Sequence, residues 1–167
     1  MRFFILITLI FFRSCSSIHV LNDYDVSVDF SAFNTFAYFK PHIDKVVISD
    51  LDKRRILKAL DLELISKGLK KSNQPDLLIS FSTKAKEKIY INNHNNWNWN
   101  PWFMHSNYNS IVSQTEGTLY INLIDVKTKQ LIWQGKGKGG INEYSKKRNE
   151  KINLFVAEIM NSYPPKE

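Results

Sequence analysis

The other predicted elements can be placed around a pattern of apolar and polar positions between residues 117 and 139. Its first half has the period of two expected of a strand with one buried face, through Leu119, Ile121 and Leu123. A polar segment follows, in which Asp125 can accept hydrogen bonds from turn amides, and residues 131–133 then resume an apolar run. The pattern predicts a β-hairpin whose largest core anchor is Trp133.

Gly135 begins a series of glycines that continues at positions 137, 139 and 140. Their spacing differs from that of a phosphate-binding P-loop, and they follow an antiparallel hairpin where a P-loop would open a βαβ unit. We therefore expect these glycines to mark flexibility at the end of a strand.

Three further segments lie upstream of the hairpin. Residues 26–30 and 33–39 are β-prone runs, and a helix is predicted from Ser49-Asp50, which can cap its first turn, to a stop at Gly68. The helix repeats apolar residues at helical spacing: Ile56, Leu57, Leu60, Leu64 and Ile65.

A long strand is predicted from residue 77 to residue 91, with apolar residues on one face and a lysine row on the other: Lys84, Lys86 and Lys88. Such alternation is typical of a sheet with one face in water. An anion-binding surface on the lysine side is the alternative interpretation.

The last predicted element is a helix over residues 146–163. Its inward set is Ile152, Phe155, Val156, Ile159 and Met160, and its outward set is Lys147, Arg148, Lys151 and Glu158. The order of elements predicts an α+β two-layer sandwich, a mainly antiparallel sheet with two helices on one face.

The N-terminus has the features of a signal peptide over residues 1–14, with a short positive start and an apolar run too short to anchor in a bilayer. The only cysteine, Cys15, follows directly and resembles the lipobox cysteine of bacterial lipoproteins, although Phe12 and Arg13 depart from that motif. We expect residues 15–25 to form a lipidated N-terminus and tether, and residues 26–165 to form a single domain. An ordinary secretory signal cut nearby is the alternative.

Net charge changes this picture little. The 167-residue chain carries a formal charge of +7, which loss of Arg2 and Arg13 with the signal peptide would lower to +5. The remaining basic residues are scattered and do not form the concentrated stripe of a nucleic-acid site. We expect a solvated surface and no nucleic-acid partner.

Residues 92–110 form an insertion rich in asparagine and aromatic residues, with neither helical nor strand periodicity. Its candidate contact residues for a ligand or interface are Trp97, Trp99, Trp102, Phe103 and Tyr108. Exposed aromatic rings suit a glycan, a membrane interface or a protein partner, and a passive flexible insertion also stays open. His94 and His105 have no Cys, Asp or Glu beside them to complete a metal shell, so we expect neither metal nor cofactor.

Several segments resemble a bacterial envelope family, the domain of unknown function 4136. They are the opening around Asp29-Phe30-Ser31, the run Gln74-Pro75-Asp76-Leu77, the hairpin Asp125…Thr128-Lys129…Trp133-Gln134-Gly135 and the close Tyr163-Pro164-Pro165. The resemblance implies a lipoprotein with this fold and no catalytic residue.

These features predict a non-enzymatic cell-envelope lipoprotein, a binding or scaffolding domain. Ser16 after the cysteine favours the outer membrane in enterobacterial sorting, with the domain facing the periplasm. Its expected partners are the membrane, through the lipid anchor, and an envelope protein or glycan. The alternative is a cell-wall-directed hydrolase, or a glycan-binding module that uses the Trp-rich insertion.

Overall fold

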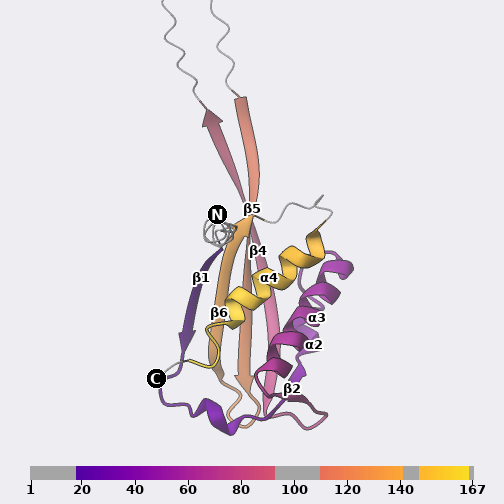
Figure 1. Ribbon diagram of the computed structural model, residues 1–167, viewed down its shortest axis with the longest axis vertical. Helices are drawn as coiled ribbons and strands as arrows, with labels where there is room; N and C mark the ends of the chain where they lie inside the picture. The colour runs from indigo at the N-terminus through magenta and orange to yellow at the C-terminus, as the bar shows by residue number, and fades with distance from the viewer. Residues whose placement is uncertain (1–17, 93–109, 141–146, 166–167) are drawn as a thin grey trace, which may run out of the picture.

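A computed structural model describes residues 18–92, 110–140 and 147–165 of the chain. Within them, six strands form one mixed sheet in the order β1-β6-β5-β4-β2-β3 (Figure 1). The strands are β1 (His19–Tyr24), β2 (Thr35–Tyr38), β3 (Lys70–Lys71), β4 (Leu77–Asn92), β5 (Ser110–Asp125) and β6 (Leu131–Gly140). The pairs β1–β6, β6–β5 and β5–β4 are antiparallel, whereas β2 runs parallel to both β4 and β3.

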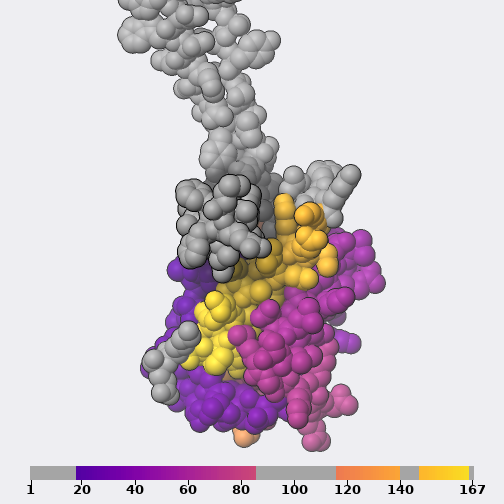
Figure 2. Space-filling model, viewed as in Figure 1, coloured from indigo at the N-terminus to yellow at the C-terminus, as the bar shows by residue number. Residues whose placement is uncertain are grey.

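Two helices, α3 (Asp50–Ser66) and α4 (Arg148–Met160), pack side by side on one face of this sheet (Figures 1 and 2). A short helix, α2 (Lys40–Ile43), and a 3-10 turn, η1 (Phe30–Ala32), lie in the connections. The predicted α+β two-layer sandwich, a mainly antiparallel sheet with helices on one face, is confirmed.

The predicted hairpin is β5 and β6. Asp125 organises its turn, because Lys127 N donates to Asp125 Oδ1 at 2.8 Å and Thr128 Oγ1 donates to Asp125 Oδ2 at 3.0 Å. Trp133 is 1% exposed and packs edge-on against Tyr163, with 5.5 Å between ring centroids.

Both predicted helices are present within a few residues of the expected ends. Ser49 caps α3 by accepting from Asp52 N at 3.2 Å, and Gly68 follows its end at a φ of +91°, which glycine adopts without steric cost. All five inward residues predicted for α4 are buried. Of the apolar residues at helical spacing in α3, Ile65 lies on the water side and is 57% exposed.

For Gly135 and Gly137, the prediction of flexibility at a strand end was wrong, whereas Gly139 and Gly140 are the last two residues of β6. Gly135 and Gly137 lie inside β6, directly beneath α4. A Cβ atom at Gly137 would stand 2.6 Å from Ile159 Cδ1 and 2.9 Å from Phe155 Cε1. The missing side chains therefore let the helix approach the sheet closely.

The N-terminal part of the domain also differs from expectation. The segment expected as a polar tether contains β1, an edge strand, so the folded domain begins before residue 26. Only Ile18 and Val20 pack on the core, and an edge strand needs no more apolar positions than that. The strand expected at residues 26–30 is absent, because Asp25 and Asp29 accept hydrogen bonds from the amides of Ser27 and Ser31 and turn the chain.

Strands β4 and β5 extend far beyond the rest of the sheet as a two-stranded ribbon (Figure 1). Strand β6 pairs with β5 only as far as Glu116, whereas β4 and β5 pair up to Asn92 and Ser110. Residues 93–109, most of the Asn- and Trp-rich insertion, follow β4 in the sequence and lie outside the described residues.

Candidate functional site

A groove of about 670 Å³ lies at the end of the sheet where β1 finishes. Four aromatic residues line it, Tyr24, Phe30, Phe33 and Tyr163, and its polar lining includes Asp29, Ser31, Asn34 and Lys67. The groove thus combines flat apolar rings with hydrogen-bonding groups, the composition typical of ligand sites.

The aromatic rings of the groove wall contact one another and the core. The Phe30 ring lies edge-on to Tyr24, Phe33 and Tyr163, at centroid distances of 6.1, 6.4 and 5.9 Å. Tyr163 in turn contacts the buried Trp133. Burial raises the pKa of Tyr163 to about 12, so its phenol stays protonated at neutral pH.

The carboxylate in the groove is held ionised. Asp29 Oδ1 accepts from Ser31 Oγ at 2.6 Å and from Ser31 N at 2.9 Å, and these hydrogen bonds lower its pKa. A carboxylate in this state can accept hydrogen bonds from a ligand but is a poor general acid. The arrangement suits binding.

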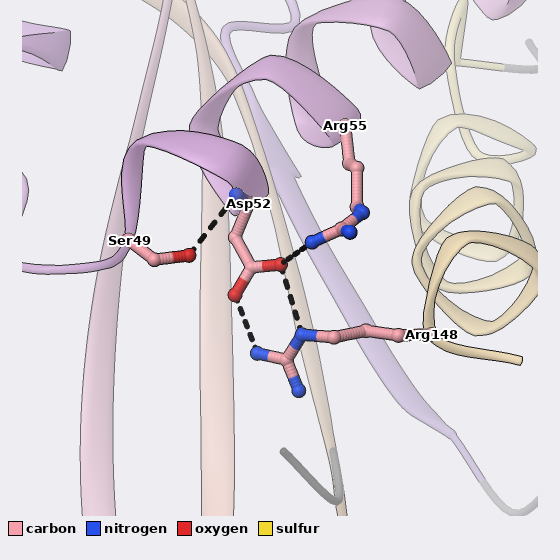
Figure 3. A network of polar contacts seen from close by, with 4 residues as sticks. All are labelled: Ser49, Asp52, Arg55 and Arg148. Carbon is pink, nitrogen blue, oxygen red and sulfur yellow. Dashed lines mark hydrogen bonds and ion pairs between the residues drawn. The ribbon is translucent and has the colours of Figure 1, made fainter. Parts of the chain in front are cut away.

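Three other carboxylates join elements of the fold. Asp52 lies between the two helices (Figure 3). Arg148 donates twice to its carboxylate, from Nε to Oδ1 at 2.9 Å and from Nη2 to Oδ2. Arg55 Nη1 donates to Asp52 Oδ1 at 2.8 Å. The hydrogen bonds from Arg148, against the opposing effect of burial, lower the pKa of Asp52 to about 2. The prediction that Arg148 faces water was wrong, because its side chain is only 19% exposed.

The other two carboxylates connect β2 to its neighbours. Tyr38 Oη donates to Asp61 Oδ1 at 2.6 Å, which joins β2 to α3. Asp76 Oδ2 accepts from Thr35 Oγ1 at 2.7 Å and from Thr35 N at 3.0 Å, which joins the start of β2 to the residue before β4. Each of these acids already has a structural partner.

The sheet face opposite the helices carries a cluster that we call the Tyr120 patch: Leu21, Lys84, Tyr120, Lys136 and Lys138. The ammonium groups of Lys84 and Lys136 lie 5.6 and 5.7 Å from the centroid of the Tyr120 ring. Lys138 pairs with Glu116 at 3.2 Å, and Leu21, opposite Lys136 in the register, is 65% exposed.

Of the candidate residues that the structure describes, Trp133 and Gly135 lie against each other in β6, and Asp125 lies in the hairpin turn. Trp133, Asp125 and Gly135 have the packing and turn roles given above. Cys15 and the aromatic residues of the insertion lie outside the described residues: Trp97, Trp99, Trp102, Phe103 and Tyr108. No group of three or more His, Cys, Asp or Glu that could hold a metal occurs among the described residues.

The groove and the Tyr120 patch could not be found from the sequence. The groove joins the β1–β2 connection to the end of α3 and the C-terminal segment, which are far apart in the chain. The patch combines residues of four strands that share a face only through their register. Only the lysine row of the long strand gave a signal.

Comparison with known families gives a match to "Domain of unknown function (DUF4136)" over residues 20–165. The chain belongs to this family. No curated protein matches the DUF4136 chain. No helix within the described ranges is long and apolar enough to span a membrane.

Solved structures share the fold of this DUF4136 domain. One is a PDZ domain protein from Parabacteroides distasonis, with 17% identity, a TM-score of 0.55, and coverage of 90% of this chain and 37% of the other. The chain thus spans little more than a third of that protein. Another is a PelC dodecamer from Paraburkholderia phytofirmans, with 8% identity, a TM-score of 0.53, and coverage of 90% and 99%.

Proposed function

We propose that this DUF4136 protein is a non-enzymatic cell-envelope lipoprotein, a binding or scaffolding domain held at the periplasmic side of the outer membrane through Cys15. The observation that carries the proposal is the position of β1, which begins at His19, four residues after Cys15, and completes the edge of the sheet. A lipid on Cys15 would therefore attach almost directly to the folded domain.

The arrangement along β1 supports a binding role. The strand begins near the proposed anchor and ends at Tyr24, in the wall of the aromatic groove. The groove therefore lies at the opposite end of the strand from the proposed lipid. We propose that an envelope partner binds there, through the rings of Phe30 and Phe33 and the ionised Asp29.

Cell fractionation tests the anchor, and crosslinking tests the groove. The protein should sediment with outer membranes, and Cys15→Ala should release it. Val26 lines the groove and is 87% exposed. A photo-crosslinking residue at this position should capture a partner, and the same residue at Val47 should not. Val47 is the matched control, because it is 95% exposed and outside the groove lining. Equal capture at both positions would contradict the binding role.

The hydrolase alternative gains no support from four carboxylates whose partners are given above. A glycosidase of that kind needs two carboxyl groups facing each other across a substrate. Asp52, Asp61 and Asp76 are each occupied by a structural partner, and Asp29 accepts from Ser31. A turnover assay on peptidoglycan fragments tests this alternative, and we expect no product.

A further inference from the structure

The register of the sheet places the ribbon of β4 and β5 on the same side as the proposed anchor. His19, the first residue of β1, is level with Lys138, Thr118 and Lys84 on the neighbouring strands. From Lys84 the ribbon continues for eight more residues to Asn92, about 27 Å at the rise of a β-strand. Figure 1 shows the ribbon continuing past the start of β1.

The chain between Cys15 and His19 is much shorter than the ribbon. Four residues span at most about 14 Å when fully extended. If the strands stood upright on the membrane, with the start of β1 toward it, the ribbon would pass through the headgroups into the hydrocarbon. Beyond Glu116, toward Ser110, the only strand that pairs with β5 among the described residues is β4, and no described strand pairs with the outer edges of this ribbon. Open sheet edges do not occur in contact with lipid hydrocarbon, because their backbone groups would have no hydrogen-bond partners.

This cost disfavours an upright domain and favours strands that lie closer to the membrane plane than to its normal. We propose that the open face of the sheet, through the Tyr120 patch, lies on the anionic headgroups of the membrane that holds the anchor. This inference rests on the proposed lipidation of Cys15 and adds an orientation to it. The other broad face is covered by α3 and α4 and carries mixed charges, including Asp50 and Glu158.

The chemistry of the Tyr120 patch matches such a surface. Lys84 and Lys136 flank Tyr120 without a carboxylate partner among the described ion pairs, whereas Lys138 is already paired with Glu116. Tyrosine is enriched at membrane interfaces, where its ring meets apolar groups and its hydroxyl meets water. Leu21 adds an exposed apolar side chain on the same face.

The test compares cysteine labelling at two similarly exposed leucines on opposite faces of the anchored protein. Leu21 is 65% exposed on the open face, and Leu62 is 56% exposed on α3. Leu21→Cys and Leu62→Cys are reconstituted as full-length lipidated protein in vesicles containing phosphatidylglycerol, and each is labelled with a water-soluble maleimide. The same proteins in detergent give the unprotected rates.

We expect strong protection at Leu21→Cys and none at Leu62→Cys. A lysine near an anionic surface favours the bound orientation about fivefold, so Lys84 and Lys136 together favour it roughly 25-fold. The labelling rate at Leu21→Cys should fall by that factor, and Lys84→Gln with Lys136→Gln should restore it. The matched control, Lys58→Gln with Lys127→Gln, removes two charges elsewhere and should leave the protection intact.

Equal labelling at both positions, or protection of Leu62→Cys alone, would overturn the inference. Protection that appears only when peptidoglycan is added, and not on bare vesicles, would overturn the membrane as the partner. A protein that stays in the supernatant and labels at Cys15 would overturn the proposed function, and the inference with it. Equal labelling of protein that remains anchored would overturn the orientation alone.

Discussion

Asp52 in the first turn of α3 and Arg148 at the start of α4 are 96 residues apart in the chain and form a two-point ion pair. The pair holds the two helices together at the same end where each begins. Because the carboxylate side chain is only 10% exposed, it is poorly solvated and depends on its arginine partners.

Replacing Arg148 by Met should therefore destabilise the domain. The variant leaves a nearly buried carboxylate with Arg55 alone, and we expect a loss of about 2–4 kcal/mol in the free energy of unfolding. Lys151→Met, an exposed position on the same helix, is the matched control and should change stability by less than about 0.5 kcal/mol. Urea unfolding measures both. Equal effects would show that the ion pair contributes nothing.

The same pair predicts a pH dependence. The folded pKa of Asp52, about 2, lies below its usual value of 3.8, so the stabilisation is present above pH 4 and is lost as the pH falls through the folded pKa. The difference between the two pKa values corresponds to roughly 2 kcal/mol in the free energy of unfolding. Stability measured from pH 6 to pH 2 should fall more steeply for the parent than for Arg148→Met. Parallel curves would contradict this assignment.

Gly137→Ala should destabilise the packing of α4 on β6. The new methyl group would meet Ile159 and Phe155 at less than 3 Å, and relief of that overlap should cost about 1–3 kcal/mol. Gly117→Ala is the matched control, because a Cβ atom there meets only Gly139 O, at 3.8 Å. Thermal melts that move equally for both variants would contradict the close approach of helix and sheet.

Trp133→Ala tests the anchor of the hairpin. Loss of this buried indole should cost about 3–5 kcal/mol and loosen the groove wall, because Trp133 contacts Tyr163. Leu131→Ala, two residues away and 51% exposed, should cost far less. Chemical denaturation distinguishes the two, and a Trp133→Ala midpoint close to that of the parent would contradict the core position of the indole.

The parts of the fold with strong periodicity were predicted correctly from the sequence. Examples are the hairpin around Asp125, the helix between Ser49 and Gly68, and the buried stripe of α4. These elements follow from local spacing and capping, which the chain carries within a few residues.

Features that depend on partners distant in the sequence were missed. Strand β1 was not recognised, because an edge strand in which only Val20 packs on the core has little apolar pattern of its own. Gly137 appeared flexible because the side chain that fills its space, Ile159, lies on α4. Arg148 appeared solvent-facing because Asp52 is distant in the chain.

The mass of the mature N-terminus, measured by mass spectrometry on protein purified from membranes, tests the central claim most directly. A lipid-anchored domain predicts an N-terminal peptide that begins at Cys15 and carries a diacylglyceryl or triacyl modification. In Cys15→Ala this modified peptide should be absent and the protein should leave the membrane fraction. An unmodified N-terminus that begins at another residue in the parent protein would contradict the account.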